Sequence, residues 1–160
     1  MKRLFVVALV TAGLAGCAQW PDLRAISSNQ PKIYVTTENL LVVDQDPIVF
    51  SLTENSTVTW HLPPDRKAAF DPKSGITVDA VVKVLGKETP QIAEFRKAFN
   101  ADAKIRAQYF KCGPVTETTY SCTVSSGLLK QIPHGLYSYT IRATIGDMQV
   151  ISDPTIMPRS

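Results

Sequence analysis

Residues 133–151 read PHGLYSYTIRATIGDMQVI, and every second position from 137 to 143 is aromatic or aliphatic. Because successive side chains of a β-strand point to opposite faces, this spacing predicts a strand with one buried face. Gly146-Asp147 is a typical turn pair, and 148–151 then predicts a closing strand. This C-terminal unit indicates an antiparallel β architecture.

The same period of two recurs upstream. From Thr57 to Leu62, apolar residues alternate with threonine and histidine, which predicts Trp60 on the buried face and His61 on the solvent face. Other short strands are predicted at 33–35, 39–43, 48–50 and 76–85. About seven or eight short strands in one domain are typical of a β-sandwich.

One segment departs from this pattern. Thr89 is a suitable helix N-cap and is followed by Pro90, a residue favoured in the first helical turn. Apolar residues then recur at helical spacing, at Ile92, Phe95 and Phe99. The pattern predicts a helix over 90–101 that is inserted between strands and covers one end of the core.

The chain has three cysteines, and two of them lie ten positions apart in segments 104–113 and 118–125, which predict a hairpin. If Cys112 lies opposite Cys122, an antiparallel register also places Phe110 opposite Val124 on the same face. In an exported chain this pairing predicts a disulfide. The sequence has no Cys-x-x-Cys motif and no histidine at ligand spacing from either thiol, so no metal site is predicted.

The N-terminus has the features of an export signal. Lys2 and Arg3 precede an apolar run at 4–13, which is too short to span a membrane. Leu-Ala-Gly follows at 14–16, and then Cys17. This end of the chain resembles the lipobox signal peptide of bacterial lipoproteins.

The resemblance implies that residues 1–16 are a lipoprotein signal peptide and that Cys17 carries the lipid after cleavage. Two or more acyl chains anchor a protein stably in a membrane. Lipoproteins held at the inner membrane usually carry aspartate after the cysteine, and this chain has Ala18 there. The expected location is therefore the outer membrane, with a lipid anchor on Cys17 and the protein facing the periplasm.

Residues 17–32 are polar and contain two prolines, which predicts a lipidated flexible tether ahead of a β-sandwich domain over 33–160. Within that domain, the tripeptide Gly-Leu-Tyr at 135–137 resembles the tyrosine corner of immunoglobulin-like sandwiches. Tyr139 stands where antibody domains have a cysteine, so the resemblance concerns architecture only. The expected fold is mainly β: an immunoglobulin-like antiparallel β-sandwich with one short inserted helix.

The charge balance argues against nucleic-acid binding. Two of the 17 basic residues lie in the signal peptide, so 15 basic and 14 acidic residues remain. A nucleic-acid interface needs a basic face. We therefore expect no nucleic-acid partner.

No catalytic constellation stands out. His61 and Asp65 lie four positions apart, but without a nucleophile-elbow motif His61 is expected to be a solvated strand residue. His134 is expected in a turn. Asp44 and Asp46 would point the same way on a strand, but the proline that follows favours a bend over a calcium or acid–base pair. The sequence therefore predicts no enzyme and no cofactor.

Two functions are compatible with these features. The first is a non-catalytic cell-envelope lipoprotein whose domain is structural or binds an envelope protein. The second is a module that binds glycan or peptidoglycan through exposed tyrosines, with Tyr34, Tyr109 and Tyr120 as candidates. A hydrolase is a third alternative, and it would require a carboxylate and a serine, such as Ser51, Ser56 or Ser74, beside His61.

Overall fold

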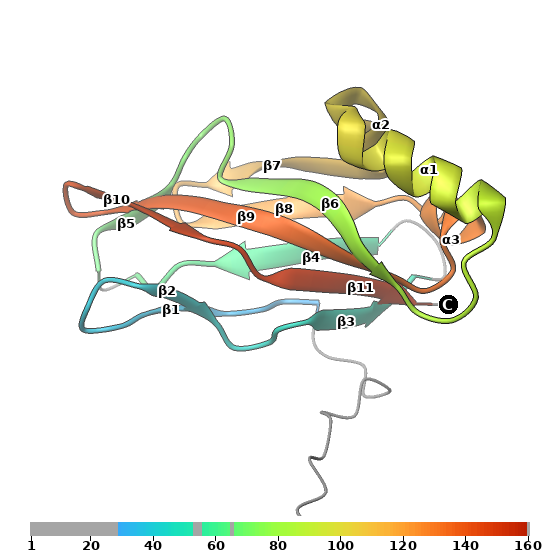
Figure 1. The fold of residues 1–160 in the computed structure, drawn as a ribbon. Coiled ribbons are helices and arrows are strands. Elements are labelled where there is room, and N and C mark those ends of the chain that lie inside the picture. Colours follow the sequence, from blue (N-terminus) through green and yellow to red (C-terminus); the bar gives the residue numbers. More distant parts are fainter. Residues whose placement is uncertain (1–28, 53–55, 65, 160) are drawn as a thin grey trace, which may run out of the picture.

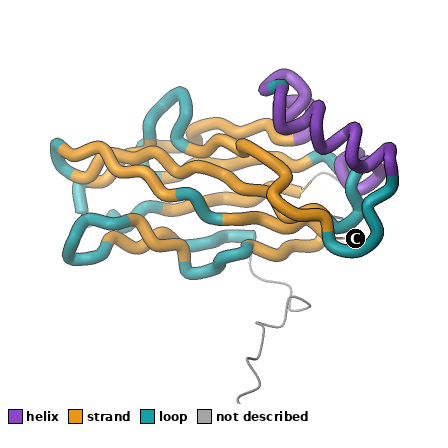
Figure 2. Tube along the Cα trace, viewed as in Figure 1, coloured by secondary structure: helices purple, strands orange, loops and turns teal. Residues whose placement is uncertain are grey.

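The computed structural model describes residues 29–52, 56–64 and 66–159, which form β-sheets and three helices (Figures 1 and 2). The strands are β1 (Ile33–Val35), β2 (Leu41–Val43), β3 (Ile48–Ser51), β4 (Ser56–His61), β5 (Ala68–Phe70), β6 (Ile76–Val84), β7 (Phe110–Thr116), β8 (Thr119–Val124), β9 (Gly135–Ile145), β10 (Met148–Ser152) and β11 (Thr155–Arg159). The helices are α1 (Pro90–Ala101), α2 (Ala103–Tyr109) and α3 (Gly127–Gln131). In this described part, no helix is long and apolar enough to cross a membrane. The fold is mainly β, as predicted. The described residues form three helices where one was predicted, and the β3–β11 pair is parallel where an antiparallel sandwich was predicted.

The long strand β9 organises the larger sheet. It pairs antiparallel with β5 and β6 on one side and with β10 and β11 on the other. Strand β3 extends this six-stranded sheet by pairing parallel with β11. A second sheet has the order β4-β8-β7, and β1 pairs with β2 in a third.

Aromatic side chains from the two larger sheets meet in the core. Trp60 of β4 packs on Tyr139 of β9, with ring centroids 5.3 Å apart, and its indole N–H donates to the phenol oxygen at 3.1 Å. Phe70 of β5 packs on Tyr120 of β8 at 5.4 Å. The two sheets therefore face each other across an aromatic layer. Trp60 is buried and His61 is exposed, as predicted.

The predicted inserted helix is confirmed as α1, with the predicted bounds. The hydroxyl of Thr89 accepts a hydrogen bond from the Ile92 N–H at 3.3 Å, and Pro90 occupies the first turn. Phe99 is fully buried, and its ring centroid lies 5.4 Å from that of Tyr137. Helix α1 thus covers one end of the core, where the helices group in Figure 2.

Residues 104–109 were predicted as part of a strand, and this prediction is wrong because they form α2. The carboxylate of Asp102 accepts a hydrogen bond from the Lys104 N–H at 2.8 Å, which caps a second helix directly after α1. The residues that follow are mostly good helix formers. The strand begins only at Phe110.

The predicted cysteine pairing is confirmed in the sheet of β4, β8 and β7. Cys112 of β7 lies opposite Cys122 of β8, and a disulfide of 1.98 Å joins them. Cys122 is buried on the core side of its sheet. The bridge therefore ties together two neighbouring strands of one sheet rather than the two sheets.

Residues 29–32 were predicted as the end of the tether, but they pack on the domain. The Asn29 carbonyl accepts a hydrogen bond from the Thr59 N–H at 3.0 Å. The Asn29 side-chain amide donates to the Thr57 carbonyl at 3.1 Å. These bonds hold the segment along β4, so it belongs to the folded domain.

The resemblance to a tyrosine corner fails at its defining hydrogen bond. Tyr137 is buried near the start of β9, and its hydroxyl has no hydrogen-bond partner within the described residues. In a tyrosine corner that hydroxyl bonds to upstream backbone. Here the ring folds back over Gly135, where an added Cβ would lie 2.7 Å from a ring carbon. Burial raises the pKa of the Tyr137 phenol above its usual range, so the hydroxyl stays protonated.

Candidate functional site

Several residues of interest lie outside the described residues. They include the signal peptide at 1–16, the lipidation residue Cys17 and the remaining tether up to residue 28. Asp65, the carboxylate proposed beside His61, is also outside. Lipidation of Cys17 stays a prediction from the sequence.

Among the described residues, the His61 side chain contacts a threonine hydroxyl. Its Nδ1 lies 3.4 Å from the Thr119 hydroxyl on the neighbouring strand β8, at an exposed surface. Two serines that could have completed a triad are engaged elsewhere. Ser56 donates to the Ser51 carbonyl at 3.2 Å, and Ser74 donates to the Asp71 carboxylate at 2.8 Å. His134 is exposed in a turn, as predicted.

Asp44 and Asp46 act as acceptors for backbone groups rather than as a catalytic pair. The Lys32 N–H donates to Asp44 Oδ1 at 2.9 Å, which closes the β1–β2 hairpin. Asp46 Oδ1 accepts from both the N–H and the hydroxyl of Thr155, at 2.9 and 2.6 Å. Burial raises the pKa of the Tyr139 phenol above its usual range, and the negative charges of Asp46 and Asp44 add to this effect.

The three tyrosines proposed to bind glycan do not gather in one place. Tyr34 is 51% exposed on β1, whereas Tyr120 is buried in the core. Burial raises the pKa of the Tyr120 phenol. Tyr109 is half-buried, with its ring edge-on to Phe95 at 5.5 Å. Within residues 29–52, 56–64 and 66–159, no three potential metal-ligating side chains come together either.

A depression of about 470 Å³ lies between β6, α2 and β7. Its two arginines bind the protein itself. Arg106 donates to the carbonyls of Phe99 and Asn100 at 2.9 and 3.0 Å, which caps the end of α1. Arg142 donates to the Thr77 hydroxyl at 2.9 Å. These cations hold the fold together and do not converge on the depression as a polar site.

Strand β10 is the feature for which the fold itself gives no structural role. Among the described residues β10 forms a ladder with β9 only, and β2 lies beside its other side without pairing with it. Residues 148–152 read MQVIS and contain no charge and no proline. Met148 and Ile151 are 48% and 65% exposed. A neutral, exposed edge of this kind is suited to pair with a further strand.

The direction of the peptide groups in β10 follows from β9. The Arg142 N–H donates to the Gly75 carbonyl at 2.8 Å, and its carbonyl accepts from the Asp71 N–H at 3.0 Å, so both groups point away from β10. Ile151 is the cross-strand partner of Arg142, and its peptide groups therefore point away from β9. Gln149, two residues earlier, has the same orientation. These two residues present N–H and C=O groups to the open side.

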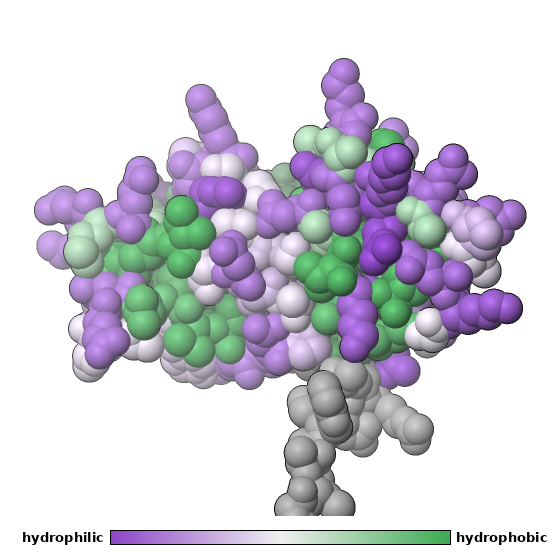
Figure 3. Space-filling model, viewed as in Figure 1, coloured by the Kyte–Doolittle hydropathy of each residue, from purple (hydrophilic) through white to green (hydrophobic). Residues whose placement is uncertain are grey.

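Strand β2 runs beside β10 but forms its ladder with β1 (Figure 1). A groove of about 260 Å³ lies between β2 and the end of β10. The residues that line it are Leu41, Val42, Val43, Asp46, Ser152, Asp153 and Pro154. Leu40 and Val42 are exposed, and Figure 3 shows apolar side chains gathered over this end of the molecule. We call strand β10 and this groove the β10 edge.

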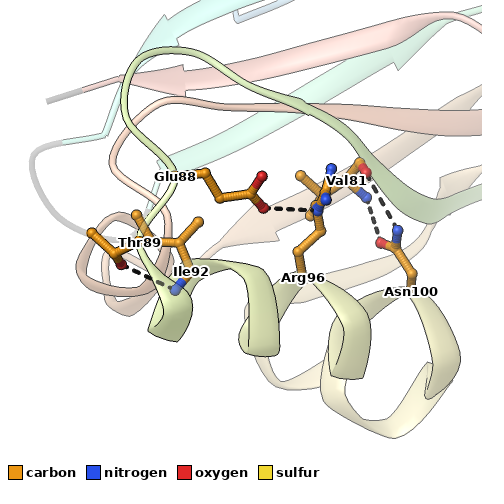
Figure 4. Close-up of polar contacts among 6 residues, drawn as sticks. All are labelled: Val81, Glu88, Thr89, Ile92, Arg96 and Asn100. Carbon is orange, nitrogen blue, oxygen red and sulfur yellow. Dashed lines mark hydrogen bonds and ion pairs between the residues drawn. The ribbon is translucent and has the colours of Figure 1, made fainter.

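On the opposite side of β9, helix α1 covers β6 at Val81. Asn100 of α1 accepts a hydrogen bond from the Val81 N–H at 2.7 Å and donates to the Val81 carbonyl at 3.3 Å (Figure 4). One side-chain amide thus occupies the donor and the acceptor that a neighbouring strand would use on β6. An ion pair of 3.0 Å between Arg96 and Glu88 ties α1 to its preceding loop.

Comparison with known proteins gives no relative. The chain matches no known protein family, no curated protein and no solved structure.

The sequence reasoning did not single out either edge of the sheet. The β10 edge had a signal, because a neutral five-residue strand lies between Asp147 and Asp153. Asn100 gave none, since its partner Val81 is 19 positions away and no local pattern links the two.

Proposed function

We propose that this protein is a non-catalytic lipoprotein of the cell envelope and that its domain binds an envelope protein through the β10 edge. The lipobox-like sequence ending at Cys17 supports a lipid anchor, and Ala18 supports the outer membrane, facing the periplasm. A short tether would then keep the domain close to the membrane surface.

The strand order supports an immunoglobulin-like sandwich as the scaffold. In such domains strands A, B, E and D form one sheet, and strands C, F and G form the other. Here β4, β8 and β7 have the places of B, E and D. Strands β6, β9 and β10–β11 have the places of C, F and G. The disulfide lies between neighbouring strands of one sheet, which differs from the inter-sheet bridge of antibody domains.

The observation that carries the proposal is the open side of β10. An unpaired, neutral strand is a risk for aggregation, and proteins usually protect it with charge, proline or a covering element. This chain covers the Val81 peptide groups of β6 with Asn100, whereas the outward peptide groups of Gln149 and Ile151 on β10 have no strand partner among the described residues. An edge kept open in this way is explained by a partner that covers it.

The proposal can be tested in intact Gram-negative cells with a photo-crosslinking residue at Met148, which is exposed. Gln149→Pro removes an N–H that points to the open side, whereas Gln149→Ala keeps it and serves as the matched control. We expect a reproducible cross-linked envelope protein with Gln149→Ala and its loss with Gln149→Pro. Recovery of the protein alone in both variants would contradict the proposal.

The anchor needs its own measurement. Mass spectrometry of the mature protein is expected to show an N-terminal Cys17 that carries acyl chains. An unmodified Cys17 thiol, or an N-terminus that retains residues 1–16, would rule out the lipid anchor while leaving the docking test unaffected.

A second candidate function is peptidoglycan binding, and the surroundings of Tyr34 favour it. Tyr34 lies at a groove of about 300 Å³ together with His61, Pro63 and Pro64. An exposed ring beside prolines is a surface on which a sugar can stack. Co-sedimentation with purified sacculi that is lost in Tyr34→Ala would support this function. A protein that stays in the supernatant would exclude it.

A further inference from the structure

The β10 edge has a charge pattern as well as a hydrogen-bonding pattern. Asp147, Gln149, Ile151 and Asp153 are alternate residues. Gln149 and Ile151 share a face of β10, while Asp147 lies in the turn before the strand and Asp153 follows its last residue. The Thr140 hydroxyl of β9 lies 2.8 Å from Asp153 Oδ1 and 2.6 Å from Asp79 Oδ2, so the two carboxylates share its one proton and the Asp153 side chain lies over β9. The outward-facing peptide groups of β10 thus lie between two carboxylates six positions apart.

This pattern disfavours pairing of β10 with a second copy of the chain. In the antiparallel register that pairs all five residues of the strand, Asp147 of one copy lies opposite Asp153 of the other. Like charges directly opposite each other destabilise a strand pair. The same two carboxylates would favour a strand that carries cations at both ends.

We infer that the β10 edge binds an extended segment of another protein that has basic residues at both ends and apolar residues between them. This inference rests on the proposed docking function and specifies its partner. The segment adds antiparallel to β10 and bonds to Gln149 and Ile151. Because Cα atoms of β2 lie within 8 Å of β10 and adjacent strands are about 4.8 Å apart, β2 must move away from β10 to admit the segment. The first basic residue of the segment lies opposite Asp153. Two positions later an apolar residue lies opposite Ile151, and six positions later the second basic residue lies opposite Asp147.

A synthetic peptide tests this chemistry directly. Lys-Thr-Val-Val-Gln-Thr-Lys places its lysines opposite Asp153 and Asp147, and a matched control peptide has glutamate at both ends. The full chain, purified in detergent, is titrated with each labelled peptide at low salt. We expect the lysine peptide to bind about tenfold more tightly, because two favourable cross-strand pairs replace two unfavourable ones.

A charge-reversal substitution at Asp147 tests the register in which the peptide pairs with β10. Asp147→Lys should reverse the preference at one end only, so a peptide with lysine first and glutamate last should bind this variant more tightly than the two-lysine peptide does. Asp147 is an exposed turn residue, so the substitution leaves the core intact. Binding of both peptides should be lost with Gln149→Pro and retained with Gln149→Ala.

The result that would overturn the inference is equal binding of the lysine and glutamate peptides, or binding that survives Gln149→Pro. Its failure can be told apart from failure of the docking proposal. If the cellular cross-link still depends on the Gln149 N–H while the peptides show no charge preference, the edge docks a protein but the basic class of partner is wrong.

Discussion

The two sides of the six-stranded sheet are treated in opposite ways. On the β6 side, Asn100 of α1 forms both hydrogen bonds that a neighbouring strand would form with Val81 (Figure 4). On the β10 side, Gln149 and Ile151 direct their peptide groups outward, and nothing in the described chain pairs with them. The difference is that a side-chain amide covers β6 at Val81, whereas the outward peptide groups of Gln149 and Ile151 on β10 have no strand partner in the described chain.

The first prediction concerns β9, the strand that pairs with both β6 and β10. Gly135→Ala should destabilise the domain by about 3 kcal/mol, because its Cβ would overlap the buried Tyr137 ring at 2.7 Å. Gly113→Ala is the matched control, since a Cβ there meets nothing within 4 Å. Urea unfolding monitored by tryptophan fluorescence measures both. Equal stability of the two variants would refute the account of β9.

The second prediction tests whether the β10 edge depends on the disulfide in the other sheet. Replacing Cys112 and Cys122 together by serine should lower the free energy of unfolding by about 2.5 kcal/mol, because the bridge restricts the unfolded chain. The folded protein should keep its cross-linking partner at the β10 edge. A variant that folds but no longer cross-links would show that the edge and the bridge are coupled.

The third prediction removes the hydrogen bonds that Asn100 forms with Val81 of β6. Asn100→Ala leaves the Val81 N–H and carbonyl without partners and should destabilise the protein by about 1.5 kcal/mol. Lys97→Ala, an exposed position on the same helix, is the control. We also expect faster amide exchange at Val81 and more aggregation on heating, since β6 becomes a second open edge. Unchanged exchange at Val81 would show that Asn100 does not protect it.

The fourth prediction concerns self-association through β10. Each charge change there should alter the free energy of association by less than about 1 kcal/mol. Asp147→Lys would place lysine opposite Asp153 when two copies of β10 pair, so self-association should increase. Asp147→Asn removes one charge without adding the opposite one and should have a smaller effect. Sedimentation velocity in detergent compares the variants with the parent protein. A monomer at all concentrations in the Asp147→Lys variant would contradict the role assigned to these carboxylates.

Local patterns in the sequence were sufficient for some elements and not for others. The helix 90–101 was predicted with its bounds, because Thr89, Pro90 and the spacing up to Phe99 are all local signals. A hairpin with Cys112 opposite Cys122 was expected, and its register, with Phe110 opposite Val124, is confirmed. The strand predicted over 104–109 was wrong because the cap at Asp102 was not recognised.

Features that depend on distant contacts could not be predicted. Strand β11 pairs with β3, more than 100 positions earlier, and no local signal specified that parallel ladder. Which strand becomes an edge is likewise decided by the whole topology. The neutral composition of 148–152 could therefore be interpreted only after the structure showed that β10 pairs with β9 alone among the described strands.

Native-state amide hydrogen exchange on the purified full chain tests the central claim most directly. Within β10, the account predicts rapid exchange at Gln149 and Ile151 and slow exchange at Val150, whose N–H points toward β9. It also predicts slow exchange at Val81, which Asn100 covers. Slow exchange at Gln149 and Ile151 in the isolated protein would show that this edge is already paired, and the account would be wrong.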